Sequence, residues 1–315
     1  MKKTFAILIA ALLSLSLLAG CGGDDTETSA VTTTLPSENT VPTATVPEAP
    51  QSTFDSSKEI VVISREDGSG TRGAFIELFG IQQKNDAGEN VDLTTLEATI
   101  TNSTSVMMTT VSTNDFAIGY ISLGSLNDTV KALIIDGAAA TVENIVSGSY
   151  KVSRPFNVAT LGDVSEVTQD FLDFILSKDG QDVITNGGYI AASDAGAYNG
   201  SKPSGKIVVA GSSSVTPIME KLKEAYLAVN PNAEIEIQQS DSSTGMTAAI
   251  DGICDIGMAS RELKDSEKDA GLADVCIAID GIAVIVNNNN PLDNLTKEQV
   301  MEIFIGELVK WSEVS

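Results

Sequence analysis

Two spacing patterns of apolar and polar residues alternate along residues 58–315. Short apolar or strictly alternating runs predict β-strands; they are EIVVIS (59–64), FAIGYIS (116–122), KIVVAG (206–211), AEIEIQQ (233–239) and IAVIVN (282–287). Apolar residues spaced by three and four positions predict helices; they are AFIELFGI (74–81), VTQDFLDFILSKDGQDVI (167–184), PIMEKLKEAYLAV (217–229) and LTKEQVMEIF (295–304). Strands that alternate with helices indicate the α/β class.

The ends of these runs carry helix-start and linker signals. Pro217 stands in the first turn of one predicted helix, where the N–H that proline lacks is not needed. Thr296 and Gln299 have capping-box spacing at the start of another. The turn-rich stretch DAGAYNGSKPSG (194–205) separates two α/β segments, and we interpret it as a linker.

The first 57 residues follow a different pattern. Lys2 and Lys3 precede the apolar run FAILIAALLSLSLLAG (5–20), which is too short for a good membrane span and is followed by Cys21. This arrangement resembles a bacterial lipoprotein signal, with residues 1–20 cleaved and Cys21 lipidated. The alternative is an ordinary secretory signal followed by an accidental cysteine. Residues 21–57 are rich in Thr, Ser and Pro, and we expect them to form a disordered stalk.

Composition excludes several classes of ligand. The formal charge of −24 would repel nucleic acid and anionic lipid. Aromatic residues make up only 5% of the chain, which argues against sugar clefts and base-stacking platforms. Cys254 and Cys276 either form a disulfide or remain as two free thiols. With these cysteines and no histidine, we expect no metal site.

Three clusters of Ser, Thr and Gly each stand between a strand signal and a helix signal. They are SGTRG (69–73), GSSSVTP (211–217) and SDSSTGM (240–246). The start of a helix has unpaired N–H groups and a partial positive charge, and hydroxyls add neutral donors. A single cluster is most simply explained as N-capping. Three clusters together predict a shared oxyanion site, in which local donors act despite the net negative charge.

Arginines accompany these clusters. A guanidinium pairs bidentately with a tetrahedral oxyanion, and we predict this role for Arg65. Arg72 and Arg261 are either part of the same site or solvated surface residues. Asp67, two residues after Arg65, is predicted to hold the Arg65 side chain in place.

Several motifs together resemble the phosphate-binding proteins of bacterial ABC importers, the PstS type. They are SREDGSGTRGAF (64–75), AIGYIS (117–122), YKVSRPF (150–156), FLDFILSKDGQ (171–181), GSSSVTP (211–217), SDSSTGMTAAIDGICDIGMASREL (240–263) and IFIGELVKW (303–311). The resemblance covers nearly all of residues 58–315. It implies an α/β, two-lobed periplasmic-binding-protein-like fold of type II, with inorganic phosphate in the cleft between the lobes. It implies neither enzyme activity nor a cofactor.

Carried across position by position, the resemblance implies three phosphate-binding loops. The predicted phosphate-binding residues are Ser214 and Val215 in the first loop, Ser242 and Ser243 in the second, and Arg65, Ser69, Gly70 and Thr71 in the third. Val215 would offer only its backbone N–H. Ser260 is also assigned to the site, at a position where some relatives have a carboxylate that accepts a proton from phosphate and thereby rejects sulfate. Asp241 is a candidate for a substitute acceptor.

The order of the motifs departs from the usual pattern of the family. Its members normally begin at the GSS-type motif and reach SREDGSGTR after the Trp-containing segment, whereas here SREDGSGTR comes first. The resemblance therefore implies a circular permutation, with the linker joining the old ends; a fragment of a tandem array is the alternative. Strand 59–64 is then expected beside the chain end near Trp311. The predicted lobes are residues 58–154 with 282–315, and residues 155–281, with crossings near Arg154 and Gly281.

These observations predict a lipid-anchored, extracytoplasmic and monomeric receptor that binds phosphate and delivers it to a membrane ABC permease. We expect membrane contact through the lipid only, and no contact with nucleic acid. One alternative is a receptor for another tetrahedral oxyanion such as sulfate. The others are a phosphohydrolase with Ser69 as nucleophile and an interaction protein on the same fold. The hydrolase is disfavoured because the sequence has neither a histidine nor a clear carboxylate metal cluster.

Overall fold

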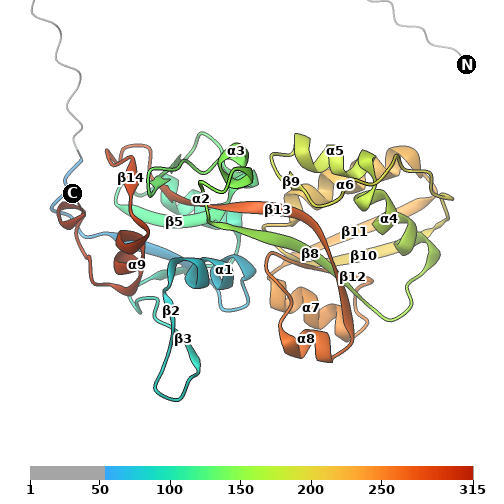
Figure 1. Ribbon diagram of the computed structural model, residues 1–315, viewed down its shortest axis with the longest axis horizontal. Coiled ribbons are helices and arrows are strands. Elements are labelled where there is room, and N and C mark those ends of the chain that lie inside the picture. Colours follow the sequence, from blue (N-terminus) through green and yellow to red (C-terminus); the bar gives the residue numbers. More distant parts are fainter. Residues whose placement is uncertain (1–53, 315) are drawn as a thin grey trace, which may run out of the picture. The chain divides into compact units, whose positions relative to one another are not determined.

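The computed structural model describes residues 54–314, which belong to one compact unit, residues 50–315 (Figure 1). The predictions for the signal peptide, for Cys21 and for the stalk up to residue 53 lie outside the described residues. No helix within residues 54–314 is long and apolar enough to cross a membrane.

A ten-stranded sheet runs through the molecule. Along its main path the strands are, in spatial order, β11 (Ala233–Ser240), β10 (Gly205–Ser212), β12 (Ile256–Ala259), β8 (Ser153–Leu161), β13 (Leu272–Val286), β5 (Ala117–Ser122), β1 (Val61–Arg65) and β4 (Thr99–Thr101). Three parallel strands stand at each end of this path, and β8 and β13 between them pair in antiparallel fashion with their neighbours. The short strands β6 (Lys131–Ala132) and β9 (Ile190–Ala191) pair with β13 off the path. This mixed sheet with its helices agrees with the predicted α/β class.

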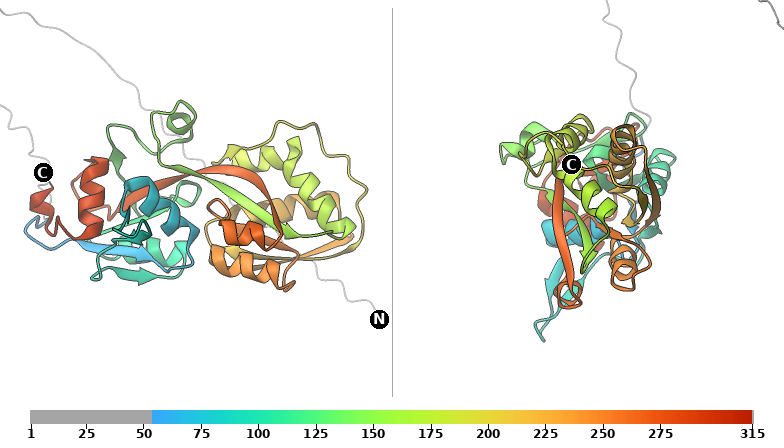
Figure 2. Two further views of the ribbon diagram at one scale, coloured as in Figure 1. Left: turned by 60° about the horizontal axis from the view of Figure 1, so that its bottom comes forward. Right: turned by 90° about the vertical axis from the view of Figure 1, so that its right-hand side faces the viewer.

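Buried side chains form two main cores on either side of the β8–β13 pair. The first core takes its members from residues 62–152 and 282–314. The second takes its members from residues 156–278, and a smaller cluster drawn from residues 159–272 lies in the same part of the chain. We call the parts of the molecule around these cores the first lobe and the second lobe. Among the strands of residues 54–314, only the β8–β13 pair carries the sheet from one lobe to the other (Figure 2).

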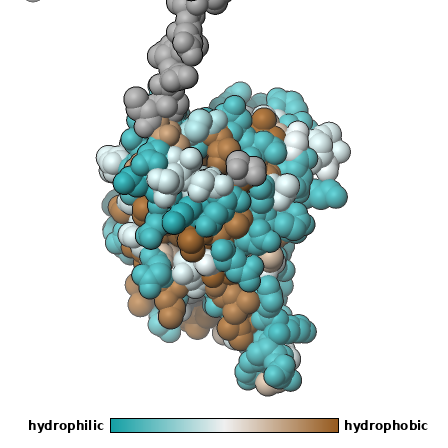
Figure 3. Space-filling view, turned by 90° about the vertical axis from the view of Figure 1, so that its left-hand side faces the viewer, coloured by the Kyte–Doolittle hydropathy of each residue, from teal (hydrophilic) through white to brown (hydrophobic). Residues whose placement is uncertain are grey.

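Helices cover the sheet in both lobes. The first lobe has α1 (Gly70–Phe79), α2 (Thr104–Ser112), α3 (Val142–Val146), α9 (Lys297–Ile305) and the 3-10 turns η1 (Leu123–Ser125) and η2 (Trp311–Glu313). The second lobe has α4 (Glu166–Leu176), α5 (Lys178–Asn186), α6 (Thr216–Val229), α7 (Ser242–Ile250) and α8 (Asp265–Asp269). The first lobe also contains the pairs β2 (Gln82–Lys84) with β3 (Asn90–Asp92) and β14 (Asn294–Leu295) with β7 (Ile134–Ile135). Apolar side chains gather on the end face beside the projecting β2–β3 hairpin (Figure 3).

The predicted helix at 167–184 is wrong in one respect, because the segment forms two helices. Ser177 ends α4 and caps α5, since its hydroxyl accepts from the Gly180 N–H at 3.3 Å and donates to the Phe174 carbonyl at 2.6 Å. A Cβ atom at Gly180 would lie 2.2 Å from the Phe174 carbonyl oxygen, so the turn requires glycine. The predicted capping box of Thr296 and Gln299 is confirmed at the start of α9.

The start and the end of the described chain lie together. The Ile60 N–H donates to the Val309 carbonyl at 2.8 Å, and the Trp311 N–H donates to the Lys58 carbonyl at 3.3 Å. This confirms the prediction that strand 59–64 lies beside the end near Trp311. Phe54 packs on the first core, with its ring 6.0 Å from that of Trp311. The prediction of a disordered stalk is therefore wrong for residues 54–57, because an aromatic side chain anchors this segment.

Candidate anion-binding site

Four helices begin where the two lobes meet, each shortly after a strand of the sheet. In the first lobe, α1 follows β1 and α2 follows β4; in the second, α6 follows β10 and α7 follows β11. Side chains of Ser69, Ser103 and Asp241 accept from backbone N–H groups in the first turns of α1, α2 and α7. The positive ends of four helices are therefore grouped at one place, an arrangement that favours binding of an anion.

Hydroxyl groups from both lobes meet at these helix starts. Thr71 of α1 shares a hydrogen bond of 2.8 Å with Ser214, which precedes α6. Thr104, the first residue of α2, shares hydrogen bonds of 3.1 Å with Ser214 and 3.4 Å with Ser213. All four side chains are buried. The predicted residues Thr71 and Ser214 thus face each other directly across the two lobes.

Ser260 extends this group on the second lobe. Its hydroxyl accepts from Ser212 at 3.0 Å, and its N–H donates to the Ser242 hydroxyl at 3.1 Å. Thr71 lies 3.5 Å from it across the lobes. We define the hydroxyl cluster by these contacts; its members are Thr71, Thr104, Ser212, Ser213, Ser214, Ser242 and Ser260.

Gly70 allows α1 to approach this cluster closely. A Cβ atom at Gly70 would lie 2.4 Å from the Ser242 hydroxyl and 2.8 Å from the Ser260 hydroxyl. A larger residue would therefore have to displace these two hydroxyls of the second lobe. Gly70 belongs to the first turn of α1, where backbone N–H groups lack partners inside the helix.

Arg65 supplies a buried positive charge beside the hydroxyl cluster. Its Nη2 donates to Ser213 at 3.1 Å across the lobes, and its Nε and Nη2 donate to the Glu66 carboxylate at 2.8 and 2.7 Å. The prediction that Asp67 holds Arg65 is wrong. Asp67 pairs with Arg72 instead, and its side chain is 99% exposed because the turn after Glu66 directs it outward.

Tyr120 fixes the backbone at this point. Its hydroxyl accepts from the Arg65 N–H at 3.1 Å and lies 2.9 Å from the Ser64 hydroxyl. Burial raises the pKa of Tyr120 to about 12, so the phenol remains protonated at neutral pH. Its ring stacks on Phe75 of α1 at 3.9 Å. A neutral tyrosine in the first core therefore positions the main chain that carries Arg65.

Arg72 and Arg261 lie at the rim of the site rather than inside the hydroxyl cluster. Arg72 pairs with Asp92 at 2.9 Å and donates to the Arg65 carbonyl at 2.8 Å. Arg261 binds both oxygens of Glu267. Burial alone would raise the pKa of Glu267, but the hydrogen bonds from Arg261 and the Lys264 N–H hold it below its usual value. Neither arginine is a freely solvated surface residue.

Three predicted site residues have other contacts. Ser243 accepts from Arg261 at 3.2 Å at the rim. The Val215 N–H donates to the Ser212 carbonyl at 3.0 Å, so this group is already paired. Asp241 uses both carboxylate oxygens to cap α7 through Thr244. These contacts place all three beside the hydroxyl cluster and not in it.

Ser69 is also a capping residue. Its hydroxyl accepts from the Arg72 N–H at 3.3 Å, and its N–H donates to the Glu66 carbonyl at 3.0 Å. A cavity of 160 Å³ opens beside it and is lined by Asp67, Gly68, Ser69, Arg72, Ser243 and Arg261. Ser69 therefore lies between the rim and the hydroxyl cluster.

Sequence reasoning missed Thr104 and the α2 start that presents it. The segment TNSTSV (101–106) has the same character as the three predicted clusters. The strand before it, β4, has only three residues, two of which are exposed, so it lacks the apolar run that marks a strand. A search for Ser/Thr runs before helical spacing, without the strand requirement, would have found it.

In the described part of the chain, the cysteines are free thiols and no side-chain group is arranged as a metal site. Cys254 is buried and Cys276 is half-buried, and both are free. Burial raises the pKa of the Cys254 thiol to about 11, which keeps it protonated. Within residues 54–314, no group of three His, Cys, Asp or Glu side chains is arranged to hold a metal ion.

Comparison with known proteins places the chain in a family. Residues 50–179 and 196–315 match the family described as the PBP superfamily domain. Phosphate-binding protein PstS 2 of Streptococcus agalactiae serotype V is 53% identical over 315 residues, which cover 100% of this chain and 98% of that protein. Phosphate-binding protein PstS 2 of Streptococcus pneumoniae serotype 4 is 45% identical over 256 residues, or 81% of this chain and 87% of that protein.

A solved structure extends the similarity to the fold. The crystal structure of a phosphate-binding protein of a phosphate ABC transporter from Streptococcus pneumoniae TIGR4 matches with a TM-score of 0.65 and 44% identity. The match covers 82% of this chain and 100% of that one. With the two lobes, the grouped helix starts and these relatives in view, the chain belongs to the PstS-type phosphate-binding proteins of the PBP superfamily.

Proposed function

We propose that this protein binds inorganic phosphate at the hydroxyl cluster, between its two lobes. The observation that carries the proposal is the direct contact of Thr71 and Arg65 in the first lobe with Ser214 and Ser213 in the second. A tetrahedral oxyanion needs donors from several directions, and four helix starts with one arginine supply them. The names of the streptococcal relatives support phosphate as the anion.

Binding would require the cluster to exchange partners. The hydroxyls now bond to one another, and each can rotate to donate to an anion instead. Each donor left unpaired around a dehydrated anion would weaken binding, so both lobes must contribute at once. Arg65 would turn part of its guanidinium from Ser213 toward the anion while Glu66 keeps it in place.

Sulfate is the second candidate, and one observation favours it. Within the described residues, no carboxylate makes a hydrogen bond to a hydroxyl of the cluster, and Ser260 stands where some relatives have one. A carboxylate acceptor would reject sulfate, which has no proton to give at neutral pH. The hydroxyl oxygens of the cluster can accept a proton from phosphate, and hydroxyls also accommodate sulfate.

Calorimetry with the full-length chain separates these candidates. We expect phosphate and arsenate to bind more tightly than sulfate. Tighter binding of sulfate would assign the site to that anion, and no heat with any of the three would exclude an oxyanion receptor. Hydrolysis is not expected, because the relatives are binding proteins and Ser69 acts as a helix cap with no histidine in the chain.

We also propose that the protein is an extracytoplasmic receptor, anchored by lipid on Cys21, that works as a monomer and passes phosphate to an ABC permease. The signal-like start of the sequence and the transporter named for the pneumococcal structure support this role. Replacing Cys21 with Ser should release the protein from membranes. Retention of the variant in the membrane fraction would contradict the anchor.

The boundaries of the lobes and the circular permutation remain proposals of the same kind. We place one lobe at residues 58–154 with 282–315 and the other at residues 155–281, supported by the membership of the two cores. The pairing of Ile60 with Val309 supports the permutation, because those segments would be adjacent in the usual motif order.

A further inference from the structure

Polar groups without partners are concentrated where the strands cross between the lobes. Among residues 54–314, six buried side-chain nitrogen or oxygen atoms have no hydrogen-bond partner. Five of them lie on four residues around this crossing: Ser122 Oγ, Ser125 Oγ, Tyr189 Oη, and Nε and Nη1 of Arg154. Buried polar groups are normally paired, so such a concentration calls for a physical explanation.

The crossing is organised by a buried ion pair. Arg154 of β8 lies opposite Asp280 of β13 in the sheet register, and its Nη2 donates to Asp280 Oδ2 at 3.1 Å. The two side chains are 2% and 1% exposed. Arg154 also lies 5.4 Å from the ring centre of Phe156, a member of the second core. We call Arg154, Asp280, Tyr189, Ser122 and Ser125 the crossing cluster.

The crossing cluster joins the two lobes through Gly124 and Tyr189. Gly124 of η1, in the first lobe, donates its N–H to Asp280 Oδ1 at 3.3 Å. Tyr189, in the second core, lies so close that a Cβ atom at Gly124 would be 2.1 Å from its Cζ and 2.6 Å from its Oη. Burial and then the Asp280 charge raise the pKa of the Tyr189 phenol above its ordinary value, whereas Ser122, Arg154 and Ser125 lower it; these four residues lie near the phenol.

We propose that the contact of Gly124 with Tyr189 positions the two walls of the anion site and at the same time opposes their closure. In the structure this contact is present together with the Thr71–Ser214 hydrogen bond, and the Tyr189 hydroxyl has no hydrogen-bond partner. Separation of the lobes would let water reach this phenol and the two serine hydroxyls. The crossing cluster would therefore favour release of the anion. This inference rests on the function proposed above.

A double-mutant cycle tests the positioning role. Gly124→Ala should weaken phosphate binding about tenfold, because the added methyl group meets the Tyr189 ring only when the lobes are in contact. In a Tyr189→Ala background the same substitution should change the dissociation constant little. An equal effect in both backgrounds would overturn the inference, as would unchanged binding by Gly124→Ala. Gly196→Ala, whose Cβ would meet nothing within 4 Å, is the control.

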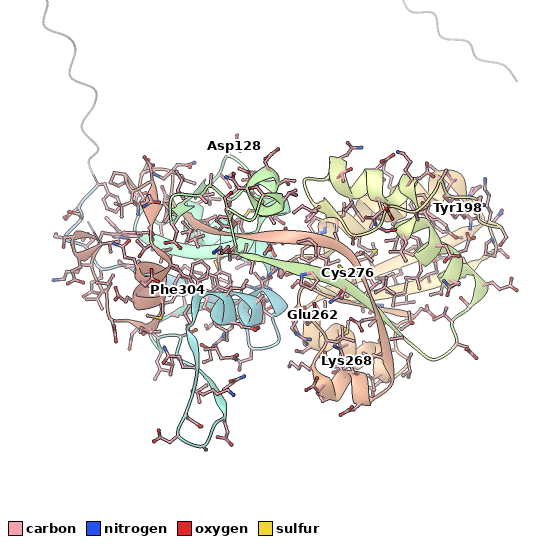
Figure 4. All side chains as sticks on the ribbon, viewed as in Figure 1. Asp128, Tyr198, Glu262, Lys268, Cys276 and Phe304 are labelled. Atoms are coloured by element: carbon pink, nitrogen blue, oxygen red, sulfur yellow. The ribbon has the colours of Figure 1, made fainter. Side chains whose placement is uncertain are left out.

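Tyr189→Phe tests the opposition to closure. It keeps the ring and removes the unpaired hydroxyl, so phosphate should bind about three- to tenfold more tightly, chiefly through slower dissociation. Unchanged or weaker binding would overturn this part. Tyr198→Phe is the matched control, because the Tyr198 hydroxyl is paired with Asp170 on the flank of the second lobe far from the first (Figure 4).

The wild-type titration distinguishes failure of this inference from failure of the proposed function. A wild-type chain that binds phosphate but gives no difference among the variants would refute the inference alone. A wild-type chain that binds no oxyanion would refute the function. In that second case, small-angle X-ray scattering tests the inference: Gly124→Ala should enlarge the radius of gyration only when Tyr189 is present. Thermal unfolding shows that each variant is folded.

Discussion

The hydroxyl cluster and the crossing cluster are both buried, polar and placed between the lobes, yet their hydrogen bonding is opposite. In the hydroxyl cluster each side chain has at least one partner, and Ser260 has contacts with three other hydroxyls. In the crossing cluster five polar atoms have none. The first arrangement keeps its donors ready for exchange with an anion. The second makes contact between the lobes costly, so binding and release draw on different groups.

The largest effect should come from breaking the ion pair of the crossing cluster. Asp280→Ala leaves the Arg154 guanidinium buried without a counter-charge, and loss of one partner of a buried pair costs about 3–5 kcal/mol. The free energy of unfolding in urea measures this. Asp293→Ala, which breaks an exposed pair with Lys131, is the control and should have little effect. A small loss for Asp280→Ala would show that solvent reaches the crossing.

Removal of Arg65 tests the anion site at the hydroxyl cluster, beside which the Arg65 guanidinium lies. Arg65→Ala should weaken phosphate binding on the order of 100-fold, because hydrogen bonds to a charged group contribute about 1.5–3 kcal/mol each. Lys264→Ala removes a positive charge at the rim and should change binding far less. Calorimetry compares the two variants. If the two variants lose phosphate affinity by the same factor, the protein attracts the anion by general positive charge and not by the buried guanidinium.

Stability should depend on pH through Asp280. Burial raises the pKa of Asp280 in the folded protein to about 6. The unfolded chain releases this proton near pH 4, so between about pH 4 and 6 the folded state holds a proton that the unfolded state has lost. The free energy of unfolding should therefore fall by about 1–3 kcal/mol as pH rises through this window.

Asp280→Asn provides the measurement. The variant lacks the titrating carboxyl, so its own stability should change less over the same pH range. Urea unfolding at several pH values between 4 and 7 should show the difference between wild type and variant shrinking as pH rises. A difference that stays constant would mean that Asp280 titrates normally.

The smallest effect is expected at Thr104. Thr104→Val keeps the shape of the side chain and removes one neutral hydroxyl, which contributes about 0.5–1.5 kcal/mol. Phosphate binding should weaken by a factor between about two and ten. Thr110→Val, on the exposed face of the same helix, should bind as the wild type does. Normal binding by Thr104→Val would remove α2 from the site.

The sequence allowed most of the fold and part of the site to be predicted. Strong apolar runs such as residues 206–211 and 282–287 correspond to buried strands, because burial on both faces leaves a continuous apolar pattern. The break at Ser177 was missed because both helices it separates keep helical spacing. Local pattern does not show that one serine can end a helix and begin the next.

The choice of partner for Arg65 shows a different limit. Glu66 and Asp67 are both within reach along the chain, and only the path of the turn places Glu66 against the guanidinium. The crossing cluster was equally hidden. Arg154, Tyr189 and Gly124 are distant in sequence, and only the sheet register and the packing of the lobes bring them together.

The anchoring of Phe54 on Trp311 and Phe116 has a mechanical consequence. A pull on the N-terminal side enters the molecule at these rings and at the Ile60–Val309 pairing, both in the first lobe. The load does not pass through β8 or β13. Under the proposed anchoring at Cys21, the tether would act on the first lobe, and the second lobe, joined to it in the sheet by β8 and β13, should move alike in tethered and free molecules.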